Sequence, residues 1–414
     1  MRSTLLCAPL SVLLACTGLP TPAYSNPDSS VDTAPDWSDC TTMVEPGADP
    51  GTAAQTALIV AAEGDTVCLA AGTWTLTSEL SLTTNNVTIK GAGIGQTILD
   101  FSTQTVGAQG MSTLADGTTF KDFTVMDPPG DGIRATDVQN VTWSGVEVGW
   151  SAAPSTTDGA YGIYPVGCDM VRVEDSVIHG ASDAGVYVGQ STHILVKGNE
   201  VYDNVTGIEI ENSTDAEVTE NHAHDNTAGI LVFNLPGLEV GDGKRTLVTG
   251  NTSEMNNTPN FGSPGSIVSN VPQGIGVVVL ASDSNEVTGN NLNDNGSAGV
   301  FILSYIEAFL GSYDDPNYNA YAAGNYVHEN RFLNNGTAPD PLLASLLASP
   351  RPLPDIIWDG CEDPVLTAAF NGNCVYNNGV ATYLDADFCG GFANPNTDIS
   401  AVTCVGQSVA EQNL

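Results

Sequence analysis

Short runs of alternating apolar and polar residues recur along most of the chain, and a glycine near the start of each run marks their spacing. These glycines are residues 132, 162, 185, 207, 229, 274 and 299, and the closest of them lie 22 or 23 residues apart. A second alternating row follows each first row, and a third short piece ends in a turn such as Asp203-Asn204. Alternation with a period of two is typical of β-strands. Three strands per repeat predict one coil of an all-β, single-stranded parallel β-helix.

The isoleucine and valine positions of these rows are predicted to point inward and to form a continuous core as the coils stack. The second row ends in a polar position that is asparagine in nearly every repeat, namely Ser176, Asn199, Asn221, Asn251, Asn290 and Asn330. Asparagines stacked at one turn predict a ladder of side-chain hydrogen bonds. The Asp-Asn pairs at the third turn suit left-handed backbone geometry.

The ends of such a stack need caps, because open strand edges pair with other chains. Residues 52–63 are the one convincing helical stretch and are predicted to cover the N-terminal end. We expect a signal peptide at 1–15, a flexible tether at 16–38, the β-helix at 39–338 with its N-terminal cap at about 39–75, and a disulfide-pinned C-terminal cap at 339–414. Insertions at 234–246, 256–273 and 305–325 predict lateral loops, where binding sites tend to lie.

The charge of the chain limits its partners. Among 414 residues, 48 are acidic and 10 are basic, which gives a net charge of −38. This balance leaves no general means of neutralising phosphates, so nucleic acid is excluded as a partner, and so is a basic contact with an anionic membrane. We interpret the excess carboxylates as suited to a saline environment, with Ca²⁺ binding as the alternative.

The first residues predict export. An apolar run at residues 5–15 is too short to span a bilayer and is typical of a secretory signal. It ends in Leu13-Leu14-Ala15-Cys16, which resembles the lipobox of bacterial lipoproteins. The resemblance implies a lipid anchor on Cys16 as the sole membrane attachment. Because residue 17 is threonine rather than aspartate, it also implies an outer-membrane or cell-surface location. The alternative is an ordinary signal peptide cut near Ala23.

Export gives the cysteines a structural meaning, because disulfides persist outside the cytoplasm. Six cysteines are predicted to form disulfides: Cys40, Cys68, Cys361, Cys374, Cys389 and Cys404. We expect the pairs 40–68, 361–374 and 389–404, although four cysteines alone allow three pairings. Cys168 is left over and is predicted to be a buried free thiol.

The entry segment at residues 64–101 and the rows YGIYPVGC and AGVYVGQS resemble the right-handed parallel β-helix superfamily, which includes pectate lyases, mannuronan C5-epimerases and NosD-like proteins. Over residues 40–335 the chain is most similar to exported β-helix-repeat lipoproteins of unassigned activity that are encoded beside a diheme c-type cytochrome. The resemblance implies a right-handed helix and an envelope partner such as that cytochrome. The epimerases carry Y-G-F-D-P-H at their active site, where this chain has Tyr164 and Val166 in place of Asp and His.

The residues two and four positions after each glycine are predicted to face outward. They form a patch with the catalytic candidates Tyr164, Tyr187, Arg134 and Glu209, and with the binding candidates Tyr161, Gln190, Glu211, Asn212 and Asn234. Such a mixture suits sugar rings, which stack on aromatic side chains and offer hydroxyls to polar ones. In a lyase or epimerase, a tyrosine would serve as base or acid and Arg134 would stabilise developing charge. Glu209 and Glu211 would repel a uronate unless Ca²⁺ lay between them.

The histidines suggest a second site. His222 and His224 lie two residues apart on one predicted strand and therefore share a face. With Glu254 they are candidate ligands for a transition metal.

These observations leave three functions open. The first is an envelope lipoprotein that presents a lateral binding face to a polysaccharide or an envelope protein. The second is a polysaccharide lyase or C5-epimerase acting on uronate polymers, and the third is a NosD-like metal-handling protein. Whether the protein is an enzyme stays open at this point.

Overall fold

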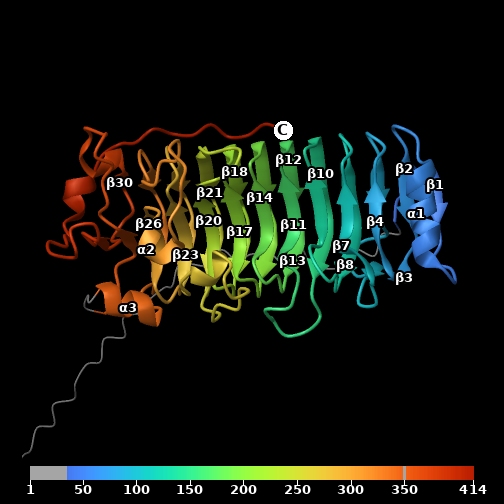
Figure 1. Cartoon of the computed structure of the whole chain (residues 1–414), viewed down its shortest axis with the longest axis horizontal. Helices are drawn as coiled ribbons and strands as arrows, with labels where there is room; N and C mark the ends of the chain where they lie inside the picture. Colours follow the sequence, from blue (N-terminus) through green and yellow to red (C-terminus); the bar gives the residue numbers. More distant parts are fainter. Residues whose placement is uncertain (1–34, 348–350) are drawn as a thin grey trace, which may run out of the picture. The chain divides into compact units, whose positions relative to one another are not determined.

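Residues 37–414 form one stack of coils (Figure 1), seen in a computed structural model that describes residues 35–347 and 351–414. The predicted signal peptide, Cys16 and most of the predicted tether lie outside the described residues. Among the described helices, none has the length and apolar character needed to cross a membrane.

Each regular coil contributes one strand to each of three parallel ladders. The first ladder is an 11-stranded sheet, here called the glycine-row sheet: β4 (Ser78–Leu82), β7 (Val106–Thr113), β9 (Ile133–Thr136), β11 (Tyr161–Val166), β14 (Ala184–Gly189), β17 (Thr206–Glu211), β20 (Ala228–Phe233), β23 (Ile275–Leu280), β26 (Ala298–Leu303), β29 (Ile356–Trp358) and β31 (Tyr383–Asp385).

The other two ladders merge into a 20-stranded sheet, because the long strands β8 and β10 belong to both. The second ladder comprises β1 (Thr42–Val44), β2 (Thr66–Leu69), β5 (Thr88–Lys90), β8 (Thr119–Met126), β10 (Gln139–Gly149), β12 (Asp169–Glu174), β15 (Thr192–Lys197), β18 (Thr214–Thr219), β21 (Lys244–Thr249), β24 (Glu286–Thr288), β27 (Tyr326–His328) and β30 (Cys374–Tyr376). The third adds β3 (Gly72–Thr75), β6 (Thr97–Asp100), β13 (Val177–His179), β16 (Glu200–Tyr202), β19 (His222–His224), β22 (Thr252–Glu254), β25 (Asn291–Asn293) and β28 (Arg331–Leu333). The predicted parallel β-helix is thereby confirmed.

The core is a set of aligned aliphatic columns. In the glycine-row sheet one inward column runs in register from coil to coil and is fully buried throughout: Ile163, Val186, Ile208, Ile230, Val277, Val300 and Ile356. Side chains that alternate between the two faces of a strand leave the intervening residues pointing outward. The sequence alternation therefore assigns both faces of the sheet correctly.

Buried asparagines join neighbouring coils, and the predicted ladder is confirmed. The Nδ2 of each asparagine donates to the Oδ1 of the next one, for example at 2.9 Å from Asn199 to Asn221 and 3.0 Å from Asn221 to Asn251. That Oδ1 also accepts the backbone N–H of the previous coil's asparagine. The ladder continues through Asn290 and Asn330 to Asn378. Two further ladders contain the residues Asn204, Asn226, Asn256, Asn295 and Asn335, and Asn285, Asn325 and Asn373.

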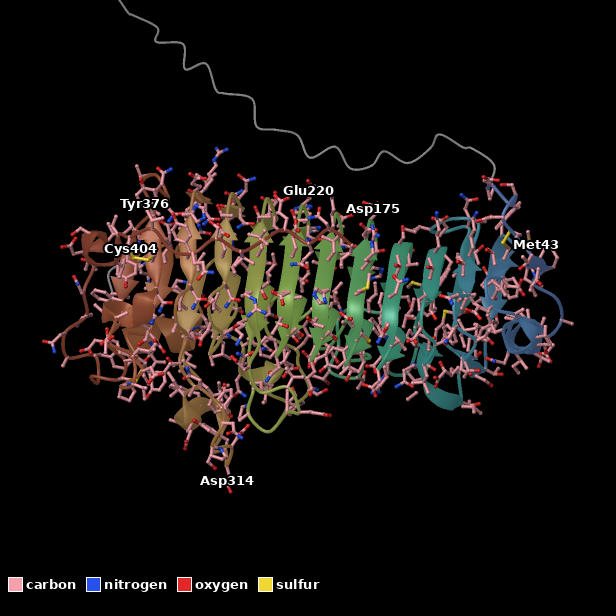
Figure 2. All side chains as sticks on the ribbon, turned by 90° about the horizontal axis from the view of Figure 1, so that it is seen from above. Met43, Asp175, Glu220, Asp314, Tyr376 and Cys404 are labelled. Carbon is pink, nitrogen blue, oxygen red and sulfur yellow. A yellow bond between two sulfur atoms is a disulfide. The ribbon has the colours of Figure 1, made fainter. Side chains whose placement is uncertain are left out.

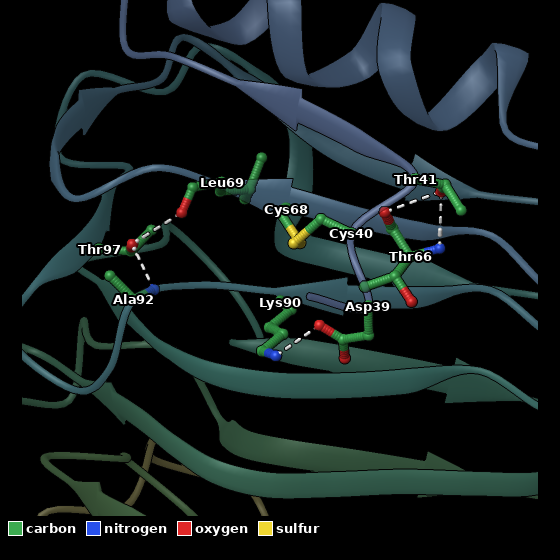
Figure 3. The surroundings of a disulfide bond; sticks show 9 residues. All are labelled: Asp39, Cys40, Thr41, Thr66, Cys68, Leu69, Lys90, Ala92 and Thr97. Carbon is green, nitrogen blue, oxygen red and sulfur yellow. Dashed lines mark hydrogen bonds and ion pairs between the residues drawn. A yellow bond between two sulfur atoms is a disulfide. The ribbon is translucent and has the colours of Figure 1, made fainter. Parts of the chain in front are cut away.

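The N-terminal end is closed by a helix, as predicted. Helix α1 (Pro50–Val60) begins where the Asp49 carboxylate accepts the N–H of Thr52 at 3.2 Å, and it buries Ala54, Ala57 and Leu58 against the first coil. A disulfide between Cys40 and Cys68 ties β1 to β2 (Figure 3), and Lys90 pairs with Asp39 at 2.8 Å beside it. The predicted 40–68 pair is confirmed.

At the C-terminal end the parallel ladders continue past residue 338, because β29, β30 and β31 pair with the coils before them. The predicted pairs 361–374 and 389–404 are wrong: Cys361 bonds to Cys389 and Cys374 to Cys404. Their separations of 28 and 30 residues match the 28 residues between Cys40 and Cys68. Each disulfide closes a loop of about one coil, whereas the predicted pairing joined cysteines that were merely close along the chain.

The last residues return along the stack across the second ladder (Figure 1). Val409 N–H donates to Glu286 at 2.6 Å and Gln412 N–H donates to Glu217 at 2.7 Å. Glu286 and Glu217 lie two coils apart, or about 10 Å, which three residues of extended chain span. The tail covers an outward column that would otherwise be exposed. The remaining helices are short: α2 (Glu307–Leu310), α3 (Pro341–Leu347), η1 (Val268–Asn270), η2 (Ala369–Gly372) and η3 (Ile399–Val402).

We expect Asn221→Ala to lower the free energy of unfolding by about 1–3 kcal/mol, because it leaves buried donors of Asn199 without their acceptor. The measurement is urea-induced unfolding followed by circular dichroism. Asn413→Ala, at an exposed position of the tail, is the matched control and should change little. Equal losses in both variants would contradict a structural role for the ladder.

We also expect peptide mapping without reductant to recover the linked pairs 40–68, 361–389 and 374–404. Cys168 should resist alkylation until the protein is unfolded, because it is 2% exposed and burial raises the pKa of its thiol to about 11. A recovered 361–374 peptide would contradict the coil-to-coil arrangement.

Candidate binding cavity

The outward face of the glycine-row sheet changes character halfway along the stack. One outward column, aligned in register, reads Arg134, Tyr164, Tyr187, Glu209, Leu231, Val278, Phe301, Ile357 and Leu384. A second reads Thr136, Val166, Gly189, Glu211, Phe233, Leu280 and Leu303. Both columns are polar or mixed up to β17 and apolar from β20 onward.

Lateral loops cover this face, so the predicted outward patch is outward but largely buried. Tyr187, Glu209 and Glu211 are 6%, 3% and 6% exposed. The covering segments come from residues 260–272, from residues 304–310 and from α3, which include two of the three predicted lateral loops. Figure 2 shows the 305–325 loop from another angle, with Asp314 at the tip of a projection on the side opposite Asp175 and Glu220.

Sheet and loops enclose a cavity of about 640 Å³. Its polar end is formed by Tyr161, Asp183, Tyr187, Glu209 and Glu211. Its apolar half is formed chiefly by Leu231, Phe233, Val278, Leu280, Phe301 and Leu303. A volume of this size lies within the range of cavities that enclose small ligands.

Three tyrosine rings pack at the polar end. The Tyr161 centroid lies 4.6 Å from that of Tyr164 and 4.5 Å from that of Tyr187, and Tyr164 and Tyr187 are 5.1 Å apart in an edge-to-face arrangement. The Arg134 guanidinium lies 4.8 Å from the Tyr164 centroid, which is cation–π geometry. Stacking on consecutive coils thus fixes the aromatic wall, and Arg134 is held at its margin.

Buried carboxyl groups stand beside these rings. The Tyr187 hydroxyl donates to Glu211, and the Thr206 hydroxyl donates to Glu209 at 2.7 Å. Burial is the main cause that raises the pKa of Asp183 to about 7 and that of Glu211 to about 6, and it raises the pKa of Glu209 as well. The negative charge of Glu211 adds to the upward shift of the Asp183 pKa.

Asp183 was missed by the sequence reasoning, which aligned only positions after each glycine. It precedes Gly185 by two residues, where the following coils carry Val205 and Thr227. A lone carboxylate in that column was the available signal. Its Oδ1 is buried and accepts no hydrogen bond from any residue that the structure describes.

Three predicted binding residues use their side chains for hydrogen bonds to backbone groups outside the cavity. The Gln190 side chain accepts the N–H groups of Glu239 and Val240, at 3.1 and 3.4 Å. Asn212 donates to the carbonyls of Leu235 and Val240, and Asn234 donates to those of Gly243 and Ala281. These side chains pin the 235–243 loop at the turn after each strand and do not line the cavity. Of the nine predicted site residues, the cavity brings together Tyr161, Tyr187, Glu209 and Glu211, with Tyr164 and Arg134 packed alongside.

The predicted role of a tyrosine as base does not suit this environment. Burial raises the pKa of Tyr164 and of Tyr187 above the ordinary value, so a tyrosinate is unfavourable at neutral pH. The tyrosines are hydrogen-bond donors and ring surfaces. At the polar end of the cavity, the carboxyls of Asp183 and Glu211 can exchange protons near neutral pH.

The predicted metal ligands lie on the third ladder, on β19 and β22, and none of them lines the cavity. His222 contacts Glu254 at 3.1 Å, and His224 contacts Glu200 at 3.3 Å. In the described part of the chain, Glu200, His222 and His224 form a group whose ligand atoms lie within 4.8 Å of one another. Glu200 therefore joins the two histidines in place of Glu254. Among the described residues, the carboxyls of the cavity do not form such a group.

Residues 109–240 match the family model described as a right handed beta helix region. No curated protein is a significant match to the sequence. The mannuronan C-5 epimerase AlgE6 A-module of Azotobacter vinelandii is 18% identical with a TM-score of 0.58, covering 83% of this chain and 93% of its own. The AlgE4 A-module of the same organism is 16% identical with a TM-score of 0.56, covering 82% and 94%.

A hyperthermoactive exopolygalacturonase from Thermotoga maritima is 9% identical with a TM-score of 0.51, covering 85% of this chain and 90% of its own. These likenesses show the shared fold, a right-handed parallel β-helix, as predicted. The three proteins themselves are carbohydrate-active.

The buried carboxyls predict an unusual pH dependence of stability. A carboxyl whose pKa is higher in the folded state binds more protons folded than unfolded between the two pKa values, so the free energy of unfolding falls as pH rises from about 4 to 7. In the Asp183→Asn variant, the decrease in the free energy of unfolding over this pH range should be smaller than in the parent by about 1–4 kcal/mol. Glu220→Gln, which changes an exposed carboxylate directly after β18, should leave the dependence of the free energy of unfolding on pH unchanged. Thermal unfolding at pH 5 and pH 8 measures the change in stability with pH for both variants. An identical change in the parent and in Asp183→Asn would contradict the raised pKa of Asp183.

Proposed function

We propose that the protein binds carbohydrate at the polar end of the cavity. The observation that carries this proposal is a cluster of three tyrosine rings, of which Tyr161 and Tyr187 line a covered cavity together with Asp183, Glu209 and Glu211. Ring faces stack on the apolar faces of a sugar, and carboxyl oxygens accept hydrogen bonds from its hydroxyls.

Charge selects among sugars. Three carboxyls line the polar end, and the guanidinium of Arg134 lies at its margin over Tyr164. A uronate carboxylate would be desolvated beside carboxyl groups that are in part ionised at neutral pH, and each ionised one would repel it. We therefore expect neutral or amino sugars to bind better than uronates, which weakens the case for a uronate lyase or epimerase.

Catalysis is the second candidate. With pKa values of about 7 and 6, Asp183 and Glu211 can hold different protonation states at neutral pH. One protonated and one ionised carboxyl in a single cavity can act as general acid and general base. Turnover of a bound oligosaccharide would then stop in Asp183→Asn and Glu211→Gln while binding persisted.

Export remains part of this proposal. Three disulfides are typical of an oxidising compartment, which agrees with a secretory signal and a lipid on Cys16. Cys16→Ser should release the protein from the membrane fraction if the lipid is its anchor. An unchanged distribution would oppose the anchor without bearing on the cavity.

The binding test is calorimetry with oligomers of glucose, of glucosamine and of a uronic acid. We expect Asp183→Ala to weaken binding of the preferred oligomer by about 10–100-fold, the loss typical of a hydrogen bond to a charged group. Glu220→Gln, a carboxylate on another face of the stack, should bind like the parent. Binding that is equally strong in Asp183→Ala would exclude the cavity as the site.

A further inference from the structure

The apolar half of the cavity calls for an explanation of its own. Outward positions of a β-strand stack are ordinarily polar, yet Leu231, Val278 and Phe301 occupy three successive coils directly after Glu209. In the parallel column Phe233, Leu280 and Leu303 follow Glu211. These three coils extend about 10 Å from the first to the last. An apolar surface of this length is therefore continuous with the polar end.

The loops that cover this surface are apolar on their inner side. Ile306, Phe309 and Leu310 from α2 and its approach face the cavity, as do Leu343 and Leu346 from α3. Phe309 is nevertheless 40% exposed and Leu342 is 47% exposed. The covering elements thus meet the sheet without closing completely over it.

The space between sheet and loops is not filled by side chains. Protein interiors pack closely, and voids larger than one water molecule are few. Water gains little in an apolar space because it finds too few polar partners there. A cavity of about 640 Å³ with six aliphatic and aromatic side chains along its floor therefore has the properties of a site for an apolar group.

The polar end sets the chemistry of the other part of the ligand. The buried Oδ1 of Asp183 lacks a hydrogen-bond donor among the described residues and lines the same cavity. A hydroxyl or ammonium group of a ligand would satisfy it, whereas an anionic group would not. The occupant therefore needs a hydroxylated, uncharged or cationic head at one end and an apolar segment at the other.

We propose that the ligand is an amphiphile of the glycolipid type, with its sugar head between the tyrosines and Asp183 and a single aliphatic chain along Leu231, Val278 and Phe301. This inference rests on the proposed carbohydrate site and extends it by naming the second half of the ligand. On the sheet floor of the cavity the outward columns change from polar to apolar once, between β17 and β20, and polarity changes once along such a molecule.

Alkyl β-glucosides below their micelle-forming concentrations are suitable probes. We expect affinity to rise about threefold to fourfold for each methylene from octyl to nonyl to decyl glucoside, as burial of a methylene predicts. Decyl glucuronide, which differs from decyl glucoside by one carboxylate, should bind at least tenfold more weakly. Calorimetry on the full chain measures both comparisons, with glucose itself as the headgroup without a chain.

Two variants test the position of the chain. Leu303→Trp adds volume inside the apolar half and should abolish the dependence on chain length, while Leu333→Trp, an exposed leucine of β28, is the matched control. Phe309→Ser should weaken decyl glucoside more than glucose. It removes a partly exposed ring, so folding is expected to survive, and Ile59→Ser on α1, 70% exposed, controls for it.

The outcomes separate the two proposals. Sugars that bind with no gain from a chain would overturn the amphiphile and leave the carbohydrate site standing. Equal affinities of decyl glucoside and decyl glucuronide would overturn the proposed recognition of the head and, with it, this ligand class. Chain-length dependence that survives Leu303→Trp but is lost in Leu333→Trp would place the chain elsewhere and overturn the inference.

Discussion

The register between successive coils is the constraint on which the rest of this structure depends. Each strand pairs in parallel with the strand one coil away, so a residue's position within its coil determines its neighbours on both sides. Inward valines and isoleucines stack into columns, and buried asparagines satisfy the polar groups of the turns from one coil to the next. A shift of one residue would turn the aliphatic columns outward and break the ladders at the same time. Core packing and polar pairing therefore enforce the same alignment.

That alignment also creates the cavity. Outward columns place Tyr164 beside Tyr187 and Glu209 beside Leu231, although these residues lie 22 or 23 positions apart in the chain. A ring triad, a carboxyl cluster and an apolar floor arise on consecutive coils without any loop having to position them. The loops then supply the cover. The stack thus fixes the positions of the cavity residues. The covering loops, which contact the stack less extensively, govern access to the cavity.

Burial changes what the polar residues can do. On an open surface the glutamates would be fully ionised and the tyrosines would offer their rings to solvent. Under the loops, desolvation raises the pKa of Asp183, Glu209 and Glu211, and Glu211 accepts a hydrogen bond from Tyr187. The cavity is thereby a place where carboxyl groups are able to stay protonated near neutral pH. This property suits the recognition of uncharged hydroxyls and also permits proton transfer.

The sequence by itself determined the parallel β-helix, the inward and outward faces and the Ser176–Asn330 ladder, because these follow from a period of two repeated at a fixed interval. It also determined the N-terminal cap, from a local helical stretch, and the free buried Cys168, from the odd number of cysteines left to pair. It also identified four of the five residues at the polar end of the cavity. The pairing of the last four cysteines, the part played by Asp183, the use of Gln190, Asn212 and Asn234 to hold a loop, and the burial of the outward patch were decided only by the tertiary structure. Each of these depends on where irregular segments fold against the stack. Such contacts join residues with no common period, so alternation along the chain carries no record of them.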